Sequence, residues 1–303
     1  MAKNIILGIS NIRGENMEIN LEQLVTNAKQ VFCALLALIM PLAGFGVPEL
    51  GAKGPEDTEI VRVMSFNVRD GEFDREEIVP QVVADYKPDS VGFQECEGTW
   101  YLTLKTYLPD YQIVGVGRWT GIELLGESTA IMFRKDKYRL IDWGTIWLSE
   151  TPDKVSLGWD SKYARTCTWA VLENKETGEQ YAHVNTHLDN AGAQAKTNGL
   201  ALVLDKVASF DMPVVLTGDF NFGKGTALYR QLTAGVKDTS AIAAQADSGT
   251  TAHGYNGGIE GNPIDFICVN DKVSEVKTYK IIRDKYNDRY VSDHYPIYSD
   301  MVM

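Results

Sequence analysis

The sequence predicts an α/β fold in which two β-sheets pack face to face and helices cover their outer faces. Three observations lead to this prediction: strand-like apolar runs alternate with helical segments, predicted strands outnumber predicted helices, and many consecutive strands have no helix between them. The last observation argues against a purely doubly wound parallel sheet, in which helices connect the strands. The chain has 303 residues, of which 44% are hydrophobic and 23% charged, enough for one large core or at most two small ones.

The individual elements follow from the spacing of apolar residues and from the turn-forming residues that bound them. Apolar runs predict strands at Ile60–Val68, Ser90–Gln94, Tyr111–Val116, Ser128–Phe133, Arg139–Thr145, Thr166–Leu172, Gln180–Thr186, Val214–Thr217, Ile264–Val269, Val276–Ile282 and Ile297–Met301. Helical spacing predicts helices at Arg75–Tyr86, Thr99–Leu108, Ala191–Ser209 and Ala227–Thr233. The sequence shows no internal repeat and no low-complexity segment.

The first 50 residues predict a leader that is separate from the folded domain at residues 58–303. Residues 31–47 are uncharged and apolar, with Lys29 before them and a polar segment after them. Pro41 and the small residues that follow it favour a cleavable export signal, so we expect a periplasmic or secreted protein. An uncleaved membrane anchor and a buried helix are the alternatives. Translation from Met17 would shorten the long polar segment before the apolar run.

Charge and cysteine content restrict the function classes. The net charge is −12 and no basic run is present, whereas proteins that bind nucleic acid non-specifically present a basic surface. This weighs modestly against a nuclease, since an acidic total does not exclude a local basic groove. Outside the leader the cysteines are Cys96, Cys167 and Cys268, which we expect to be buried free thiols. Their spacing does not predict a zinc site.

Polar side chains gather where the apolar runs end, and this pattern points to hydrolytic chemistry. Asp219 and Asn221 follow a short buried strand, and the period of two places both on the same side. Further polar groups occur in Ser65-Phe66-Asn67, Gly92-Phe93-Gln94-Glu95, Asn185-Thr186-His187-Leu188-Asp189, Ile264-Asp265-Phe266-Ile267 and Ser292-Asp293-His294. A single Gly-Asp-x-Asn segment is common in turns, so the ordered set carries the argument.

This ordered set resembles the endonuclease/exonuclease/phosphatase superfamily, which includes deoxyribonuclease I, inositol polyphosphate 5-phosphatases and bacterial sphingomyelinases. The resemblance runs from about Ile60 to the C-terminus. It implies a deoxyribonuclease I-like four-layer α/β sandwich, with two packed, mostly antiparallel β-sheets flanked by helices. It also implies that residues 58–303 form a catalytic domain that hydrolyses phosphate esters with Mg²⁺ or Mn²⁺.

The resemblance assigns roles to individual residues. It implies metal contacts for Asn67, Glu95 and Asp293, and catalytic roles for Glu127, His187, Asp219, Asn221, Asp265 and His294. Asp219 would contact the attacking water, Asn221 the scissile phosphate, and Asp265 would hold His294. Glu127 would pair with His187, the alternative being a solvated glutamate in a loop. Which histidine is the acid and which the base is left open, and His183 is expected to be a core or surface residue.

The expected activity is phosphodiester hydrolysis, with a nuclease first. The alternative is a phosphatase or phosphodiesterase that acts on sugar, inositol or lipid head-group phosphates, as sphingomyelinases do. A catalytically inactive binding module would predict loss of Glu95, His187, Asp219 or His294, and none is lost. We expect a monomer without a stable protein partner. Its binding partner would be the phosphate-ester substrate, which can be a nucleic acid. Membrane contact is expected only through an uncleaved leader. Trp119 and Thr120 stand where bacterial secreted relatives usually have two aspartates, and Ile122 stands where they have a lysine, which leaves the substrate contacts open.

Overall fold

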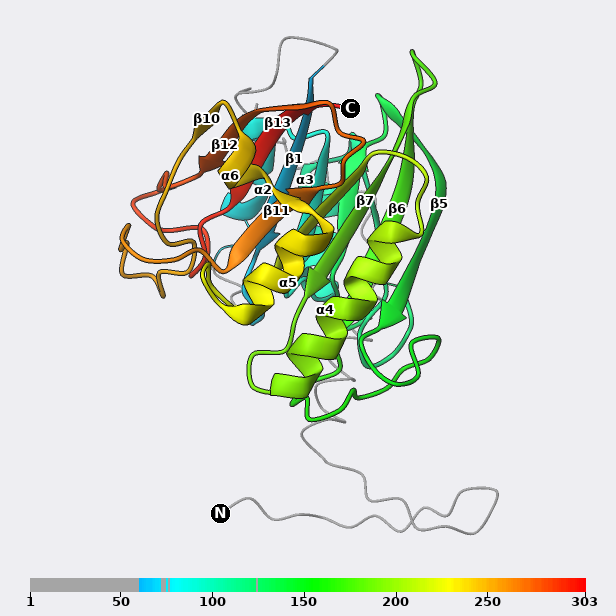
Figure 1. Ribbon diagram of the computed structural model, residues 1–303. Coiled ribbons are helices and arrows are strands. Elements are labelled where there is room, and N and C mark those ends of the chain that lie inside the picture. The colour runs from blue at the N-terminus through cyan, green and yellow to red at the C-terminus, as the bar shows by residue number, and fades with distance from the viewer. Residues whose placement is uncertain (1–59, 72–74, 76, 124) are drawn as a thin grey trace, which may run out of the picture. The chain divides into compact units, whose positions relative to one another are not determined.

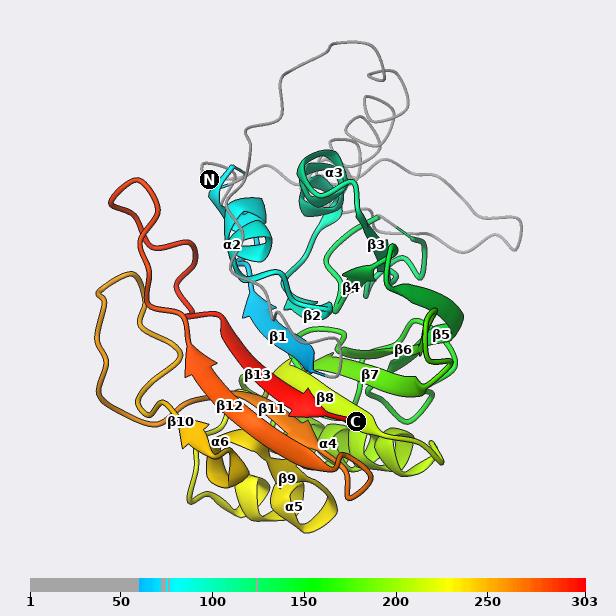
Figure 2. The ribbon, with the colours of Figure 1, turned by 90° about the horizontal axis from the view of Figure 1, so that it is seen from above.

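The computed structural model describes residues 60–71, 75, 77–123 and 125–303, shown in Figures 1 and 2. The expected export leader at residues 1–50 lies outside these residues. Within the described part of the chain, no helix is both long and apolar enough to cross a membrane.

One sheet contains seven strands in the order β10-β12-β13-β1-β2-β4-β3. Its strands are β1 (Val61–Asn67), β2 (Ser90–Gln94), β3 (Tyr111–Val114), β4 (Ile131–Arg134), β10 (Gln245–Ala246), β12 (Glu275–Ile281) and β13 (Ile297–Val302). The other sheet contains six strands in the order β5-β6-β7-β8-β11-β9. They are β5 (Tyr138–Trp147), β6 (Thr166–Asn174), β7 (Gln180–His187), β8 (Val214–Asp219), β9 (Lys237–Asp238) and β11 (Asp265–Val269).

Each sheet has a parallel pair at its centre, and these two pairs position the site. β1 pairs with β2 in parallel, and β7 pairs with β8 in parallel. Apart from the short β10–β12 pair, the other ladders are antiparallel, which confirms the predicted mostly antiparallel sandwich. Strands in a parallel pair end at the same edge of the sheet, so polar residues at their carboxyl ends come together.

Helices cover the outer face of each sheet and complete four layers (Figure 2). α2 (Ile78–Tyr86) and α3 (Gly98–Tyr107) pack on the seven-stranded sheet through a core that includes Val82, Trp100 and Leu104. α4 (Ala193–Ala208) and α5 (Ala227–Gly235) pack on the six-stranded sheet through side chains such as Leu200 and Leu232. Each helix therefore buries one apolar face and leaves its polar face to solvent.

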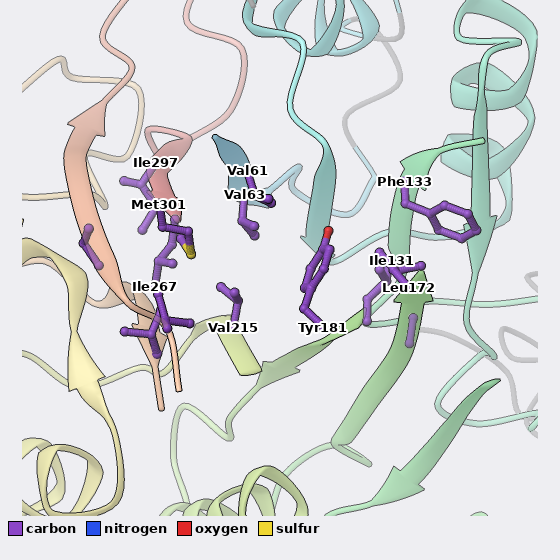
Figure 3. Packing of buried hydrophobic residues seen from close by; sticks show 14 of the residues in the cluster. Val61, Val63, Ile131, Phe133, Leu172, Tyr181, Val215, Ile267, Ile297 and Met301 are labelled. Carbon is purple, nitrogen blue, oxygen red and sulfur yellow. The ribbon is translucent and has the colours of Figure 1, made fainter. Parts of the chain in front are cut away.

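The two sheets bury a third hydrophobic cluster between them. Val63 and Phe133 from one sheet face Leu172, Val215 and Ile267 from the other, as Figure 3 shows. All five side chains are fully buried. Burying a side chain of this size contributes roughly 1.5–3 kcal/mol, so the cluster holds the two sheets, and with them the strand ends, in a fixed relation.

The structure differs from the predicted elements mainly at their ends. β4 begins at Ile131 instead of Ser128, because Ser128 forms only an isolated bridge with Cys96. α2 begins at Ile78 instead of Arg75. The short elements β9, α6 (Thr239–Ile242) and β10 were not predicted, because two to four residues are too few to show a periodicity. The three expected free cysteines are buried, which confirms that prediction.

Candidate active site

Strand ends bring the predicted site residues together. His187 is the last residue of β7, and the parallel register places it opposite Asp219, the last residue of β8. The antiparallel register of β8 with β11 places Asp265 on the other side of Asp219. From the facing sheet, Asn67 ends β1 and Glu95 directly follows β2. Asp219 is therefore the centre of the site.

Asn67 connects the two sheets at this centre. Its Nδ2 atom donates to Glu95 Oε1 at 3.0 Å and to Asp219 Oδ2 at 3.1 Å. Its Oδ1 atom accepts from the backbone N–H of Arg69 at 3.0 Å. Glu95 has a φ of 58°, a left-handed conformation that is uncommon for a glutamate and frequent at functional positions. One carboxamide thus holds two carboxylates that would otherwise repel each other.

Asp219 is a buried carboxylate whose surroundings favour its neutral form. Burial, and secondarily the charge of Asp265, raise the pKa of Asp219 to about 7, against the opposing effect of His294. Its Oδ1 atom accepts from the backbone N–H of Asn221 at 2.9 Å. A carboxyl group that titrates near neutral pH can exchange a proton with a water molecule or a substrate oxygen.

Asp265 and His294 form the expected dyad. His294 Nδ1 lies 2.9 Å from Asp265 Oδ2, and His294 Nε2 lies 3.9 Å from Asp219 Oδ2. Burial by itself would lower the pKa of His294, but Asp265, Asp219 and Asp293 outweigh it and raise the pKa to about 10. The imidazole is therefore protonated at neutral pH and presents a positive charge to the centre of the site.

His187 lies on the opposite side of Asp219 and has the opposite protonation preference. Its Nε2 atom is 3.5 Å from Asp219 Oδ2, while its Nδ1 atom is buried without a hydrogen-bond partner among the described residues. Burial, followed by the charges of Arg165 and Arg118, lowers the pKa of His187 well below its ordinary value. This shift favours the neutral imidazole.

The expected pair between Glu127 and His187 is wrong, because Glu127 pairs with Arg118. The two Glu127 oxygens contact Arg118 Nη1 at 2.6 Å and Nη2 at 2.5 Å. A planar guanidinium binds a carboxylate in this two-point geometry more strongly than a single imidazole nitrogen does. Burial raises the pKa of Glu127 to about 7, and Arg118 opposes the shift. Glu127 is therefore the partner of Arg118, and the charge of Arg118 is one of those that lower the pKa of His187.

Two further predicted residues lie near the centre but use their side chains elsewhere. Asn221 has a φ of 53°, and its Nδ2 atom donates to the backbone carbonyl of Leu188 at 3.0 Å. The Asp293 carboxylate lies 3.4 Å from Arg69 Nη1 and accepts from Ser292 Oγ at 3.3 Å. In the described part of the chain, no hydrogen bond joins Asp293 to Asn67 or Glu95.

The donor set fits a hard divalent cation. Asp219, Asp265 and Asp293 lie around the His294 imidazolium and Glu95 lies beside Asp219, and Mg²⁺ and Mn²⁺ prefer such oxygen ligands. Ligand atoms of Asp219, Asp265 and His294 lie within 4.8 Å of one another. His294 is nevertheless a poor metal ligand here, because an imidazolium has no free lone pair for a metal. Glu95 and Asp219, bridged by Asn67, form the better metal-binding pair.

A buried polar network between the sheets supports these strand ends. Gln94 Nε2 donates to Asn185 Oδ1 at 2.7 Å, and Thr217 Oγ1 contacts the same oxygen at 2.9 Å. A Cβ atom on Gly92 would lie 2.1 Å from Thr217 Oγ1, so only glycine fits at this crossing of β2 with β7 and β8. His183 also belongs here, since both its ring nitrogens are bonded, to Ser90 Oγ at 2.8 Å and to Thr217 Oγ1 at 2.9 Å. Of the two expected positions for His183, core or surface, the structure shows the core.

Comparison with known proteins agrees with this geometry. The model of the Endonuclease/Exonuclease/phosphatase family matches residues 64–294. A mannosyl-6-phosphatase from Bacteroides thetaiotaomicron is 29% identical, with a TM-score of 0.76, over 80% of this chain and 100% of its own. An endonuclease/exonuclease/phosphatase from Bacteroides vulgatus is 34% identical, with a TM-score of 0.74, over 80% and 98%. Protein L388 of Acanthamoeba polyphaga mimivirus is 26% identical over 48% of this chain and 58% of its own length.

The chain belongs to the endonuclease/exonuclease/phosphatase family. Its fold is the family's four-layer sandwich, and phosphate-ester hydrolysis is the class of reaction that family and site support.

Proposed function

We propose that this protein is a metal-dependent phosphatase of small phosphorylated molecules, with phosphorylated sugars as the first candidates. The observation that carries the proposal is the position of Asp219, a carboxyl with a pKa near neutrality, between a protonated and a neutral histidine. Proton transfer and charge stabilisation on either side of one reacting group are what phosphate-ester hydrolysis requires.

Each residue of the site would have its own role in phosphate-ester hydrolysis. The His294 imidazolium, held by Asp265, would contact the phosphoryl oxygens and stabilise their growing negative charge. Asp219 would orient the attacking water and accept its proton, and the neutral His187, whose Nε2 atom lies 3.5 Å from Asp219 Oδ2, would take up that proton and deliver it to the leaving oxygen. Glu95 and Asp219 would hold Mg²⁺ or Mn²⁺ with support from Asn67. When bound, the cation would neutralise phosphoryl charge and lower the pKa of a bound water.

Two observations favour a small phosphate ester over nucleic acid. The mannosyl-6-phosphatase aligns over its full length at 29% identity. The net charge of −12 provides little of the long-range attraction on which nucleic-acid binding depends. The nuclease expectation stays a prediction, which the same assay tests.

An assay panel tests the proposal. The purified chain is incubated with Mg²⁺ or Mn²⁺ and with mannose 6-phosphate, glucose 6-phosphate, sphingomyelin, single-stranded DNA or RNA, and Asp219→Asn serves as the inactive control. We expect kcat/KM for the best sugar phosphate to exceed that for each other substrate by roughly tenfold or more, the discrimination that one or two lost polar contacts provide. Preferential cleavage of DNA or RNA would overturn the substrate proposal.

We also propose that the domain acts outside the cytoplasm, since the apolar stretch at residues 31–47 has the composition of an export signal. Cell fractionation and N-terminal sequencing of the protein from its producing cell test this. A cytoplasmic protein that retains residues 1–50 would contradict it.

A further inference from the structure

A group of three cations surrounds Tyr163 beside His187. We call Arg118, Lys162 and Arg165 the cationic cluster. Their charged groups lie 5.0, 5.0 and 5.5 Å from the centre of the Tyr163 ring, respectively. The charges of Arg118 and Arg165 are also felt by His187, so the cluster borders the site. This local excess of cations contrasts with the acidic chain as a whole.

Arg165 is the unusual member of the cationic cluster. It is only 6% exposed, and its side chain makes no hydrogen bond to any residue that the structure describes. The nearest carboxylate oxygen, Oδ2 of Asp189, lies 3.6 Å from Arg165 Nε. That carboxylate already accepts from the backbone N–H groups of Ala191, Gly192 and Lys162. A buried guanidinium without a hydrogen-bonded partner is costly, so the site has unused capacity to bind an anion.

Arg118, in the same cluster, has partners for only part of its guanidinium group. Its two terminal nitrogens are bonded to Glu127, yet its Nε atom is buried without a partner among the described residues. The Nε atom of Arg165 and the Nδ1 atom of His187 are also buried without a hydrogen-bond partner among the described residues. Three neighbouring side chains thus each keep a buried nitrogen unused on one side of the site.

The fold places Arg165 beside the reaction centre. β6 pairs with β7 so that Cys167 lies opposite Thr186. Arg165 is two residues before Cys167 and directly precedes β6, and His187 directly follows Thr186 on β7. Arg165 therefore lies next to the end of β7, close enough for its charge and that of Arg118 to act on His187.

We propose that the cationic cluster binds a second anionic group of the substrate, and that Arg165 is its main ligand. The substrate class is then a small molecule with two phosphates, such as a sugar bisphosphate, of which one phosphate is cleaved near Asp219 and His294. This inference rests on the proposed phosphatase function. The carboxylates at the centre of the site repel a phosphate unless a metal is bound, whereas the cationic cluster attracts an anion with or without the metal. The two regions would therefore bind two different phosphates of one molecule.

The first test measures binding without catalysis. The full chain is treated with EDTA and titrated with inorganic phosphate by calorimetry at low ionic strength. Without metal, the carboxylates repel the anion at the centre of the site, and the comparison with Arg165→Gln separates binding by the cationic cluster from contact with the His294 imidazolium. We expect binding by the unmodified protein and a roughly 10- to 100-fold weaker affinity for Arg165→Gln, which loses charge-assisted hydrogen bonds. Arg139→Gln is the matched control, since Arg139 is an exposed arginine paired with Glu173, and should bind like the unmodified protein.

No measurable phosphate binding by the unmodified protein, or equal binding by Arg165→Gln, would overturn the inference. Because Arg165 is buried, circular dichroism and thermal melting check that the variant folds. Lys162 is exposed, and Lys162→Gln provides a second test that should not affect folding. We expect this variant to bind phosphate roughly two- to fivefold more weakly, the effect of one solvent-screened charge. Unchanged binding by Lys162→Gln would show that Lys162 does not contribute to the site. If Arg165→Gln does not fold, unchanged binding by Lys162→Gln would overturn the whole inference.

The second test uses turnover. The ratio of kcat/KM for glucose 1,6-bisphosphate to that for glucose 6-phosphate is compared between the unmodified protein and Arg165→Gln. We expect Arg165→Gln to lower this ratio roughly tenfold or more, mainly through KM for the bisphosphate, and Arg165→Lys to restore part of it. An equal loss on both substrates would assign Arg165 to the scissile phosphate and overturn the inference. If neither substrate is cleaved, the proposed function fails, while the phosphate titration still decides whether the cluster binds anions.

Discussion

The two histidines that flank Asp219 have opposite surroundings. His294 is bonded to Asp265 and faces further carboxylates, which raise its pKa to about 10. His187 is buried next to Arg118 and Arg165, and its pKa is lowered well below the ordinary value. The surroundings thus favour a cationic imidazole on one side of Asp219 and a neutral imidazole on the other. The charge of neighbouring residues, more than burial, separates the two roles, because both histidines are almost fully buried.

Replacing the carboxylate that both histidines share should have the largest effect. Asp219→Asn keeps the shape of the side chain, but its one amide oxygen can accept from only one of the two donors, Asn67 Nδ2 and the backbone N–H of Asn221. It also removes the proton acceptor and one metal ligand. We expect kcat/KM on a sugar phosphate to fall roughly 10³- to 10⁴-fold. Steady-state kinetics with saturating Mg²⁺ measures the effect. A loss below tenfold would show that Asp219 is not the centre of the site.

The acidic side can be tested with a double-mutant cycle. Asp265→Asn should lower kcat/KM roughly 10²-fold, because the carboxylate acts by holding His294 and stabilising its charge. The double variant with His294→Ala should then be hardly worse than His294→Ala alone. Additive losses in the cycle would mean that the two residues act independently, in spite of their 2.9 Å contact.

The raised pKa of His294 also predicts how stability depends on pH. A histidine whose pKa is higher in the folded state contributes stability that is complete below its unfolded pKa, near 6.5, and is lost as the pH rises through about 10. Between pH 6.5 and pH 10 the unmodified protein should therefore lose roughly 2–4 kcal/mol more unfolding free energy than His294→Gln. Urea unfolding at both pH values measures this difference. Parallel losses in the two proteins would show that the imidazolium is not stabilised by the fold.

A change next to the cationic cluster should have the smallest effect, and it should raise phosphate affinity. Glu127→Gln removes the carboxylate that neutralises Arg118, so the cationic cluster becomes more positive. We expect metal-free phosphate affinity to rise about two- to fivefold, with little change in the pH–rate profile. A strong shift of that profile without tighter phosphate binding would restore the pairing of Glu127 with His187.

The sequence predicted the positions that depend on local order. Asn67, Glu95, His187 and Asp219 each end an apolar run, and the structure brings all four to one edge of the sandwich. Such positions are visible because a strand's period and its end are properties of a short segment. The Asp265–His294 contact joins residues 29 positions apart, and the family resemblance, not a local pattern, predicted that these two residues pair.

The cationic cluster and the partner of Glu127 could not be predicted from local order. The partner of Glu127 depends on the path of a loop, which places Arg118 rather than His187 against the carboxylate. Arg165 directly precedes β6, and Asp265 is the first residue of β11, so the same argument from buried charge would have marked Arg165 as a candidate. What the sequence could not show is that Arg118, Lys162 and Arg165 meet around one tyrosine ring.

The central claim is that a divalent cation held by Glu95 and Asp219 makes this protein a phosphoesterase, and phosphate release in the presence and absence of metal tests it most directly. Release from mannose 6-phosphate should stop in EDTA, return on addition of excess Mg²⁺ or Mn²⁺, and be absent in a folded Glu95→Gln, because a neutral amide is a weaker ligand for a hard cation. Full activity in EDTA, or an active Glu95→Gln, would contradict the claim.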